Sequence, residues 1–183
     1  MPLRYRVPNA LTLARLVALP FFWVLLAGAR DGRSVAAGVL FAAASLTDWF
    51  DGYLARRLNY STRFGRMADP LADRLLIDSA VLLLWWHDRL PLLVPLLILS
   101  RDVVLLIAQR AAAARGYELT VIYLGKAATA ILMVGLGLIM VTSQTAHWPT
   151  YVVEVGLGLS LLAGALYLGT VRSRLRIEVN KGT

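Results

Sequence analysis

The chain alternates long apolar stretches with short polar breaks. Six stretches have about 20 mostly apolar residues each, which is the length that a membrane-spanning helix needs. They cover about residues 10–28, 35–56, 67–86, 91–110, 120–142 and 150–171. The breaks hold glycine, proline, asparagine and charged residues, which are typical of turns. The pattern therefore predicts an all-α, polytopic membrane protein with six transmembrane helices, folded as a single domain over residues 1–183.

Composition agrees with the membrane prediction. Of the 183 residues, 58% are hydrophobic and only 16% are charged, whereas soluble domains have about 25% charged residues. Cysteine is absent from the sequence, which excludes disulfides, thiolate metal ligands and a cysteine nucleophile. The few charged residues are therefore the features that carry information about function.

The distribution of lysine and arginine predicts the orientation. Twelve of the 19 basic residues flank the stretches on the side of the two termini, three lie in the opposite breaks and four lie inside stretches. Because basic residues favour the cytoplasmic side, both termini are expected in the cytoplasm, in a multi-pass cell (inner or plasma) membrane protein. A cleavable signal sequence is the rival interpretation of the N-terminus, and Arg15 and Pro20 argue against it.

Four aspartates fall inside the apolar pattern, where a charge costs about 2.5–3.5 kcal/mol. Asp48 and Asp51 end the second stretch, and Asp69 and Asp73 begin the third. At about 100° per residue, each pair occupies one side of its helix. Because the connection is short, the two helices are expected to form an antiparallel pair that brings all four carboxylates to one depth, just inside the cytoplasmic surface.

Such a cluster needs cations to remain ionised. Oxygen-only ligands select Mg²⁺ or Mn²⁺ over zinc or copper. Gly52 and Gly65 leave room for a base or a pyrophosphate, and Arg56 is suited to pair with a phosphate. The spacing leaves two interpretations open, a metal and phosphate site or an ion pathway in a transporter. Structural pairing with nearby arginines is the third and least favoured, because buried ion pairs contribute little net stability.

The residues at these positions resemble a known signature. The chain reads Asp48-x2-Asp51-Gly52-x2-Ala55-Arg56-x8-Gly65-x3-Asp69-x3-Asp73, which is similar at all eight fixed positions to the motif of the CDP-alcohol phosphatidyltransferases. The resemblance includes the six spans and the opening residues Val7 to Arg15. It implies a phosphotransferase of phospholipid biosynthesis and makes an ion-coupled transporter the alternative from a different class.

The resemblance also implies roles for individual residues. Two divalent ions would be held by Asp48, Asp51, Asp69 and Asp73. The CDP part of CDP-diacylglycerol would lie against Gly52 and Gly65. The other contacts to it would come from Asn9, Thr12, Arg56 and Thr62. Asp73 would act as the general base on the acceptor alcohol, and CMP would leave. The resemblance also implies a homodimer, because members similar to this chain are usually homodimers. Membrane lipids are expected as partners, and nucleic acid is not.

The acceptor alcohol is less clearly indicated. Ser100-Arg101-Asp102 looks like the corresponding segment of eukaryotic-type cardiolipin synthases. Gly125-Lys126-Ala127-Ala128-Thr129 lacks the second lysine typical of phosphatidylglycerophosphate synthases. We therefore expect phosphatidylglycerol as the acceptor, giving cardiolipin, with glycerol 3-phosphate as the alternative. The acceptor-binding candidates are Arg15, Arg101 and Lys126. The open structural interpretation is that Arg101 and Lys126 reach the membrane surface, or that Arg101 neutralises Asp102.

Several polar and aromatic residues receive no catalytic role. His87 and His147 fall in the outer breaks and are expected to be solvated. Trp85, Trp86 and Trp148 are expected to form an aromatic belt at the membrane interface. Asp78 is left between pairing with Arg74 and a supporting role at the acidic site.

Overall fold

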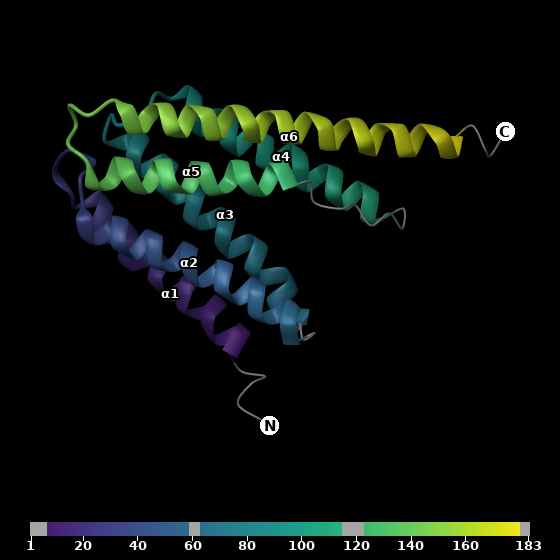
Figure 1. The fold of residues 1–183 in the computed structure, drawn as a ribbon, viewed down its shortest axis with the longest axis horizontal. Coiled ribbons are helices and arrows are strands. Elements are labelled where there is room, and N and C mark those ends of the chain that lie inside the picture. Colours follow the sequence, from purple (N-terminus) through teal and green to yellow (C-terminus); the bar gives the residue numbers. More distant parts are fainter. Residues whose placement is uncertain (1–6, 59–62, 115–122, 180–183) are drawn as a thin grey trace.

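The described part of the chain folds into six α-helices and no strand (Figure 1). The computed structural model describes the backbone of residues 7–58, 63–114 and 123–179, and the side chains of residues 13–47, 74–114 and 123–171. The helices are α1 (Val7–Ala27), α2 (Val35–Leu58), α3 (Arg63–Trp86), α4 (Leu93–Ala113), α5 (Tyr123–Val141) and α6 (Trp148–Val179). The predicted all-α class is confirmed, and each predicted stretch corresponds to one helix.

The last helix is longer than the apolar pattern predicted. α6 continues from the expected end at residue 171 to Val179. The added segment holds arginine, leucine and isoleucine and neither glycine nor proline, so nothing in it stops a helix. Hydrophobicity therefore predicted only the apolar part of α6. The helix continues beyond it because the following residues have adequate helix propensity.

The helices converge at one end of the molecule and spread at the other (Figure 1). The α1–α2, α3–α4 and α5–α6 connections lie together at the left of Figure 1, which we call the closed end. The termini lie away from it, at what we call the open end, and there α1, α2 and α3 slope away from α5 and α6. α1 packs along α2 and α3, and α6 packs along α4 and α5, with contacts of α5 to α2 and α3 joining the two groups.

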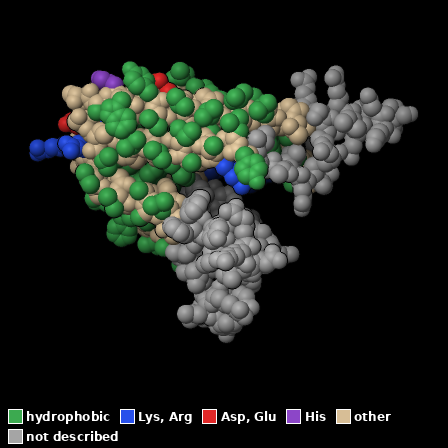
Figure 2. Space-filling model, viewed as in Figure 1, with side chains coloured by type: hydrophobic (Ala, Val, Ile, Leu, Met, Phe, Trp, Pro, Cys, Tyr) green, Lys and Arg blue, Asp and Glu red, His purple; other side chains and the backbone are tan. Residues whose placement is uncertain are grey.

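The surface is apolar over most of the described face. Figure 2 shows hydrophobic side chains spread across it, and Phe21, Val24 and Ile107 are each more than 60% exposed. α5 and the Trp148–Val171 part of α6 are long and apolar enough to cross a membrane, while Leu13–Ala27 and Val35–Thr47 are apolar but shorter. Exposed apolar surface of this extent indicates a membrane protein.

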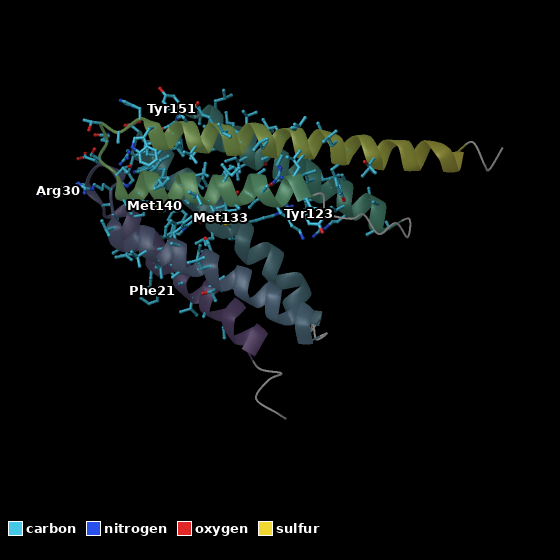
Figure 3. All side chains as sticks on the ribbon, in the orientation of Figure 1. Phe21, Arg30, Tyr123, Met133, Met140 and Tyr151 are labelled. Atoms are coloured by element: carbon cyan, nitrogen blue, oxygen red, sulfur yellow. The ribbon has the colours of Figure 1, made fainter. Side chains whose placement is uncertain are left out.

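The core lies between the helices near the closed end. Phe22 of α1 and Phe41 of α2 are fully buried, with ring centroids 5.8 Å apart. Met140 of α5 belongs to the same cluster, whereas Phe21 and Tyr151 are each 63% exposed (Figure 3). Side chains on one side of these helices are therefore buried in the core, and those on the other side are exposed.

Two glycines let α5 and α6 approach closely. A Cβ atom on Gly156 of α6 would lie 2.8 Å from the backbone nitrogen of Leu132 in α5. A Cβ atom on Gly135 of α5 would lie 2.9 Å from the backbone nitrogen of Val153 in α6. Small residues at such crossings permit the close backbone packing that stabilises helix pairs in membranes.

Arg89 joins the three connections at the closed end. Its guanidinium donates hydrogen bonds to the carbonyl oxygens of Asp31 (3.2 Å), Ile139 (2.9 Å), Thr142 (3.3 Å) and Ser143 (3.3 Å). Three of these carbonyls belong to the C-terminal end of α5, where the helix leaves carbonyls without helical partners and the dipole favours a cation. Arg89 thus binds the α1–α2 connection to the end of α5.

Burial changes the pKa of this arginine. Removal from water lowers the pKa of Arg89, the nearby Asp31 carboxylate opposes that change, and Arg33 adds to it. An arginine keeps its proton at any physiological pH, so the hydrogen bonds to the α5 carbonyls remain charge-assisted.

His87 differs from the prediction that it is solvated. The side chain is half-buried, and its Nε2 atom lies 2.9 Å from the carbonyl oxygen of Leu26 near the end of α1. Its Cβ atom would be 2.7 Å from a Cβ atom on Gly32, which has a φ of +62°. The imidazole is therefore packed between two connections, because the glycine removes the bulk that would exclude it.

Replacing Gly156 by alanine is expected to destabilise the α5–α6 pair. The new methyl group meets backbone atoms of Leu132, which cannot move aside without shifting α5, so a loss of about 1–3 kcal/mol is expected. The measurement is the midpoint of thermal unfolding in detergent micelles. Gly158→Ala is the matched control, because nothing lies within 4 Å of its Cβ position. Equal midpoints for the two variants would contradict the close packing.

Replacing Arg89 by methionine is expected to cost about 2 kcal/mol or more, since it removes charge-assisted hydrogen bonds to four carbonyls. Arg33→Met is the control, because Arg33 is exposed and makes a single 3.3 Å hydrogen bond to Val141. Thermal unfolding in micelles ranks the two. A larger loss for Arg33→Met would disprove the joining role of Arg89.

Candidate functional site

The four predicted metal ligands lie on the parts of α2 and α3 next to their connection. Asp48 and Asp51 belong to the second half of α2, and Asp69 and Asp73 to the first half of α3. These halves lie toward the open end (Figure 1). The four side chains are outside the described ones, so the meeting of the carboxylates at one point stays a prediction.

The predicted CDP-diacylglycerol contacts share this part of the fold. Gly52 and Arg56 are on α2, Gly65 is on α3, and Asn9 and Thr12 are on the first turns of α1. Because α1 packs along both α2 and α3, these backbone segments belong to one helix group. Their side chains lie outside the described ones, and Thr62 lies outside the described residues altogether.

The donor chemistry of the motif fits a hard divalent ion. Asp48, Asp51, Asp69 and Asp73 offer only carboxylate oxygens, which are the ligands that Mg²⁺ and Mn²⁺ take. Among the side chains that the structure describes, no group of three or more His, Asp or Glu residues forms another metal site. The described residues therefore offer no metal site that competes with the one predicted at the acidic motif.

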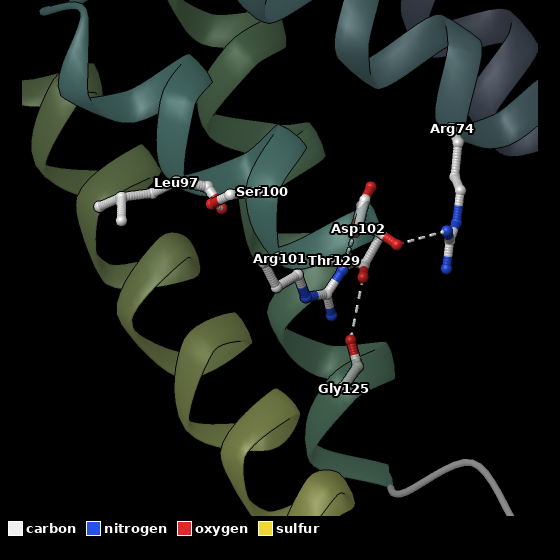
Figure 4. Close-up of polar contacts among 7 residues, drawn as sticks. All are labelled: Arg74, Leu97, Ser100, Arg101, Asp102, Gly125 and Thr129. Atoms are coloured by element: carbon white, nitrogen blue, oxygen red, sulfur yellow. Dashed lines mark hydrogen bonds and ion pairs between the residues drawn. The ribbon is translucent and has the colours of Figure 1, made fainter. Parts of the chain in front are cut away.

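Two arginines meet at Asp102 of α4 (Figure 4). The Nη1 atom of Arg101 lies 2.6 Å from Oδ1 of Asp102, and both side chains are largely buried, at 20% and 13% exposure. Nη1 of Arg74 on α3 donates a 3.1 Å hydrogen bond to the backbone carbonyl oxygen of Asp102. Since Arg74 directly follows Asp73, this bond fixes α3 to α4 next to the predicted general base.

Asp78 adds a second carboxylate to this group. It lies one helical turn beyond Arg74 on α3, and it interacts electrostatically with both Asp102 and Arg74. Its Oδ1 atom is buried and has no hydrogen-bond partner among the described residues. The prediction left Asp78 between two roles, and the structure places it beside Arg74 and Asp102 on the α3–α4 boundary.

Arg101 and Lys126 lie on two helices that both pack against α6. A Cβ atom on Gly164 of α6 would be 3.8 Å from Cγ of Arg101, and one on Gly125, the neighbour of Lys126, would be 3.8 Å from Ala163. Lys126 itself is exposed, and its ammonium lies 5.8 Å from the ring centroid of Tyr123. The meeting of the two cations at one acceptor therefore stays a prediction.

Arg15 occupies a different part of the fold. It is only 6% exposed and lies on α1, which packs against α2 and α3, whereas Arg101 and Lys126 belong to α4 and α5. Burial of an arginine in an apolar helix requires nearby polar groups. Arg15 thus belongs to the helix group of the aspartate motif, and the structure does not place it with the other two candidates.

Sequence reasoning missed the contact between Arg74 and α4. The Arg101–Asp102 pair was one of the open alternatives, and the structure confirms it. The sequence analysis considered Arg74 as a basic residue inside an apolar stretch and as a candidate partner of Asp78, but not as a link to α4. The signal that was available is that an arginine in such a stretch needs an oxygen acceptor, but the sequence does not tell which neighbouring helix supplies it.

Comparison with known proteins shows relatives over most of the chain. A CMP-forming cardiolipin synthase from Streptomyces coelicolor is 35% identical over 185 aligned positions, covering 94% of this chain and 86% of the relative. A CDP-diacylglycerol–glycerol-3-phosphate 3-phosphatidyltransferase from Shigella flexneri is 32% identical over 174 positions, covering 91% of each. The enzyme of that name from Bacillus subtilis is 39% identical over 110 positions, covering 54% of this chain and 57% of the relative.

The family model of the CDP-alcohol phosphatidyltransferases matches residues 5–162. That range contains the whole motif from Asp48 to Asp73 and the two basic residues Arg101 and Lys126. Since the match covers most of the 183 residues, the chain belongs to the CDP-alcohol phosphatidyltransferase family.

Proposed function

We propose that the protein transfers the phosphatidyl group of CDP-diacylglycerol to glycerol 3-phosphate and releases CMP. The observation that carries this proposal is the family match over residues 5–162, within which all eight fixed positions of the motif are present. The active site is assigned to the open end, where the motif segments of α2 and α3 lie.

The acceptor differs from the one favoured by the sequence. Two of the three relatives described above carry glycerol 3-phosphate in their names, and one is a cardiolipin synthase. The relatives therefore support glycerol 3-phosphate better than phosphatidylglycerol. The segment around Lys126 misled the prediction, because its missing second lysine falls at Ala128, which is fully buried. A buried position offers no place for a solvated cation, and Arg101 supplies the second charge from α4.

Residues of the chain are proposed to move the proton and to bind the CDP group. Asp73 takes the proton of the acceptor hydroxyl, whose oxygen then attacks the β-phosphorus of CDP-diacylglycerol. The bond between that phosphorus and the oxygen bridging to the α-phosphorus breaks, and its electron pair leaves with CMP. Arg56 pairs with a phosphate of the CDP group, while Gly52 and Gly65 leave space for it.

Two divalent ions, Mg²⁺ or Mn²⁺, are proposed at Asp48, Asp51, Asp69 and Asp73. When bound, such ions neutralise the charge of the diphosphate and of the leaving group. The four carboxylates would otherwise repel one another.

Arg101 and Lys126 are proposed to bind the phosphate of the acceptor. They lie on α4 and α5, which both pack against α6, and the backbone of Asp102 is joined to Arg74, the neighbour of Asp73. The same hydrogen bond therefore sets the distance between the acceptor's phosphate and the group that removes its proton. Arg15, on α1, is proposed to act from the side of the aspartate motif.

The proposal extends to membrane placement. All six helices are proposed to span the cell membrane as a single domain, with both termini and the active site on the cytoplasmic side. The twelve basic residues toward that side support the orientation. The homodimer implied by the family resemblance belongs to the same proposal.

An acceptor panel tests this function. Purified protein in mixed micelles receives labelled CDP-diacylglycerol with either glycerol 3-phosphate or phosphatidylglycerol, and CMP and the lipid product are measured with Mg²⁺, with Mn²⁺ and with a chelator. We expect CMP and phosphatidylglycerophosphate, with product lost on chelation. Cardiolipin as the main product would restore the other acceptor. Proton or ion flux in liposomes without any CMP would favour a transporter instead.

Replacing Asp73 by asparagine is expected to lower turnover by about 10²-fold or more, because it removes the proposed general base. The measurement is CMP release at saturating substrates. Asp88→Asn is the control, since Asp88 is exposed in the α3–α4 connection with a φ of +55°, which asparagine tolerates. Full turnover by Asp73→Asn would show that the base is wrongly assigned.

A further inference from the structure

The ion pair between Arg101 and Asp102 has an unusual geometry. Consecutive residues on a helix point about 100° apart and do not normally face each other. Here Nη1 of Arg101 and Oδ1 of Asp102 are nevertheless 2.6 Å apart, with both side chains largely buried. Both side chains must bend toward a shared space to make this contact, so the pair forms where the fold offers Arg101 no better oxygen acceptor.

Arg101 uses only part of its hydrogen-bonding capacity in this pair. An arginine typically binds an oxyanion through two parallel N–H donors. The hydrogen bond from Arg101 to the Asp102 carboxylate comes from Nη1. Nε of Arg101 is buried and has no hydrogen-bond partner among the described residues. Opposite it lies Gly164, whose Cβ position is 4.0 Å from that Nε, so no side chain from this position of α6 covers the guanidinium.

Asp102 has a second arginine nearby besides Arg101. The guanidinium of Arg74 is already hydrogen-bonded to the backbone carbonyl of Asp102. Together with Asp78, these residues form a group of two arginines and two aspartates. An incoming phosphate that took Arg101 would leave Asp102 beside a second cation, which avoids the cost of a lone buried charge.

We propose that Asp102 determines acceptor affinity by competing with the acceptor's phosphate for Arg101. Without acceptor, Asp102 holds Arg101; with acceptor, the phosphate takes over the guanidinium and also uses its Nε donor. The inference rests on the proposed function, since it concerns the acceptor of that same site. It makes Asp102 a specificity-determining residue, because a dianionic phosphate monoester displaces a carboxylate better than the singly charged phosphodiester of phosphatidylglycerol does.

The first test is steady-state kinetics with glycerol 3-phosphate varied at saturating CDP-diacylglycerol. Asp102→Asn removes the competing charge and nearly preserves shape, so the KM for glycerol 3-phosphate is expected to fall about three- to ten-fold with kcat within about two-fold. Asp88→Asn is the control. It removes an exposed aspartate of the α3–α4 connection that takes no part in this group, and its KM is expected to stay near that of the unmutated protein.

A double-mutant cycle assigns the effect to the pair. Arg101→Gln is expected to raise the KM, and adding Asp102→Asn to it is expected to change the KM no further. Asp102→Glu, which keeps the charge, is expected to restore a KM close to that of the unmutated protein. An unchanged or higher KM in Asp102→Asn, or an equal fall in Asp88→Asn, would overturn the inference.

A second measurement does not depend on the Asp102 variants folding. In the unmutated protein labelled with ¹⁵N-arginine, the Nε resonance of Arg101 is identified by its absence in Arg101→Gln. Glycerol 3-phosphate is expected to shift it at concentrations where glycerol does not. If the Nε resonance does not shift at a saturating concentration of glycerol 3-phosphate, the proposal is wrong. If the unmutated protein releases no CMP with either acceptor, the proposed function fails; if it is active and these readouts do not move, this inference alone fails.

Discussion

The guanidinium of Arg89 donates hydrogen bonds to four backbone carbonyls from two separate connections, and the arrangement of the helices depends on it. The end of α5 and the α1–α2 connection both carry carbonyls that need donors. In an apolar setting, such groups must be satisfied within the protein. One buried cation does this for both, so the helices are held together at the closed end and are free to spread toward the open end.

The candidate site uses the space that this arrangement leaves. Its acidic half comes from α2 and α3, and its described basic half comes from α4 and α5. The hydrogen bond from Arg74 to the carbonyl of Asp102 is a direct link between the halves. Because Arg74 follows Asp73 and Asp102 follows Arg101, that bond relates the proposed base to the proposed phosphate ligand through single peptide units. The charges of the site are therefore positioned by backbone as much as by side chains.

The apolar stretches predicted the helices well because every helix contains a long apolar run. They failed at the end of α6, since a helix continues through arginines once it has formed. Contacts between distant residues were harder to foresee. His87 was expected to be solvated, yet it packs against Gly32 and the Leu26 carbonyl. The local sequence carries no sign of a partner 61 residues away. The Arg101–Asp102 pair was foreseen because its members are adjacent.

The acidic motif was the most informative feature of the sequence. Placing charged aspartates in an apolar stretch costs free energy, so few explanations account for their presence there. The acceptor was harder to predict, since a phosphate needs positive charge and not a particular residue at a particular place. Lys126 and Arg101 come from different helices, α5 and α4. A missing lysine at Ala128 therefore says little about the total charge that an acceptor encounters.

Because the helices are joined at the closed end, a small rotation there produces a larger displacement at the open end. α3 has 24 residues, so it is about 36 Å long at about 1.5 Å per residue. A rotation of roughly 3° about the closed end would displace the far end of α3 by about 2 Å, which is the scale on which a ligand distance is made or lost. Small rearrangements around Arg89 at the closed end are thereby amplified at the open end, where the proposed site lies.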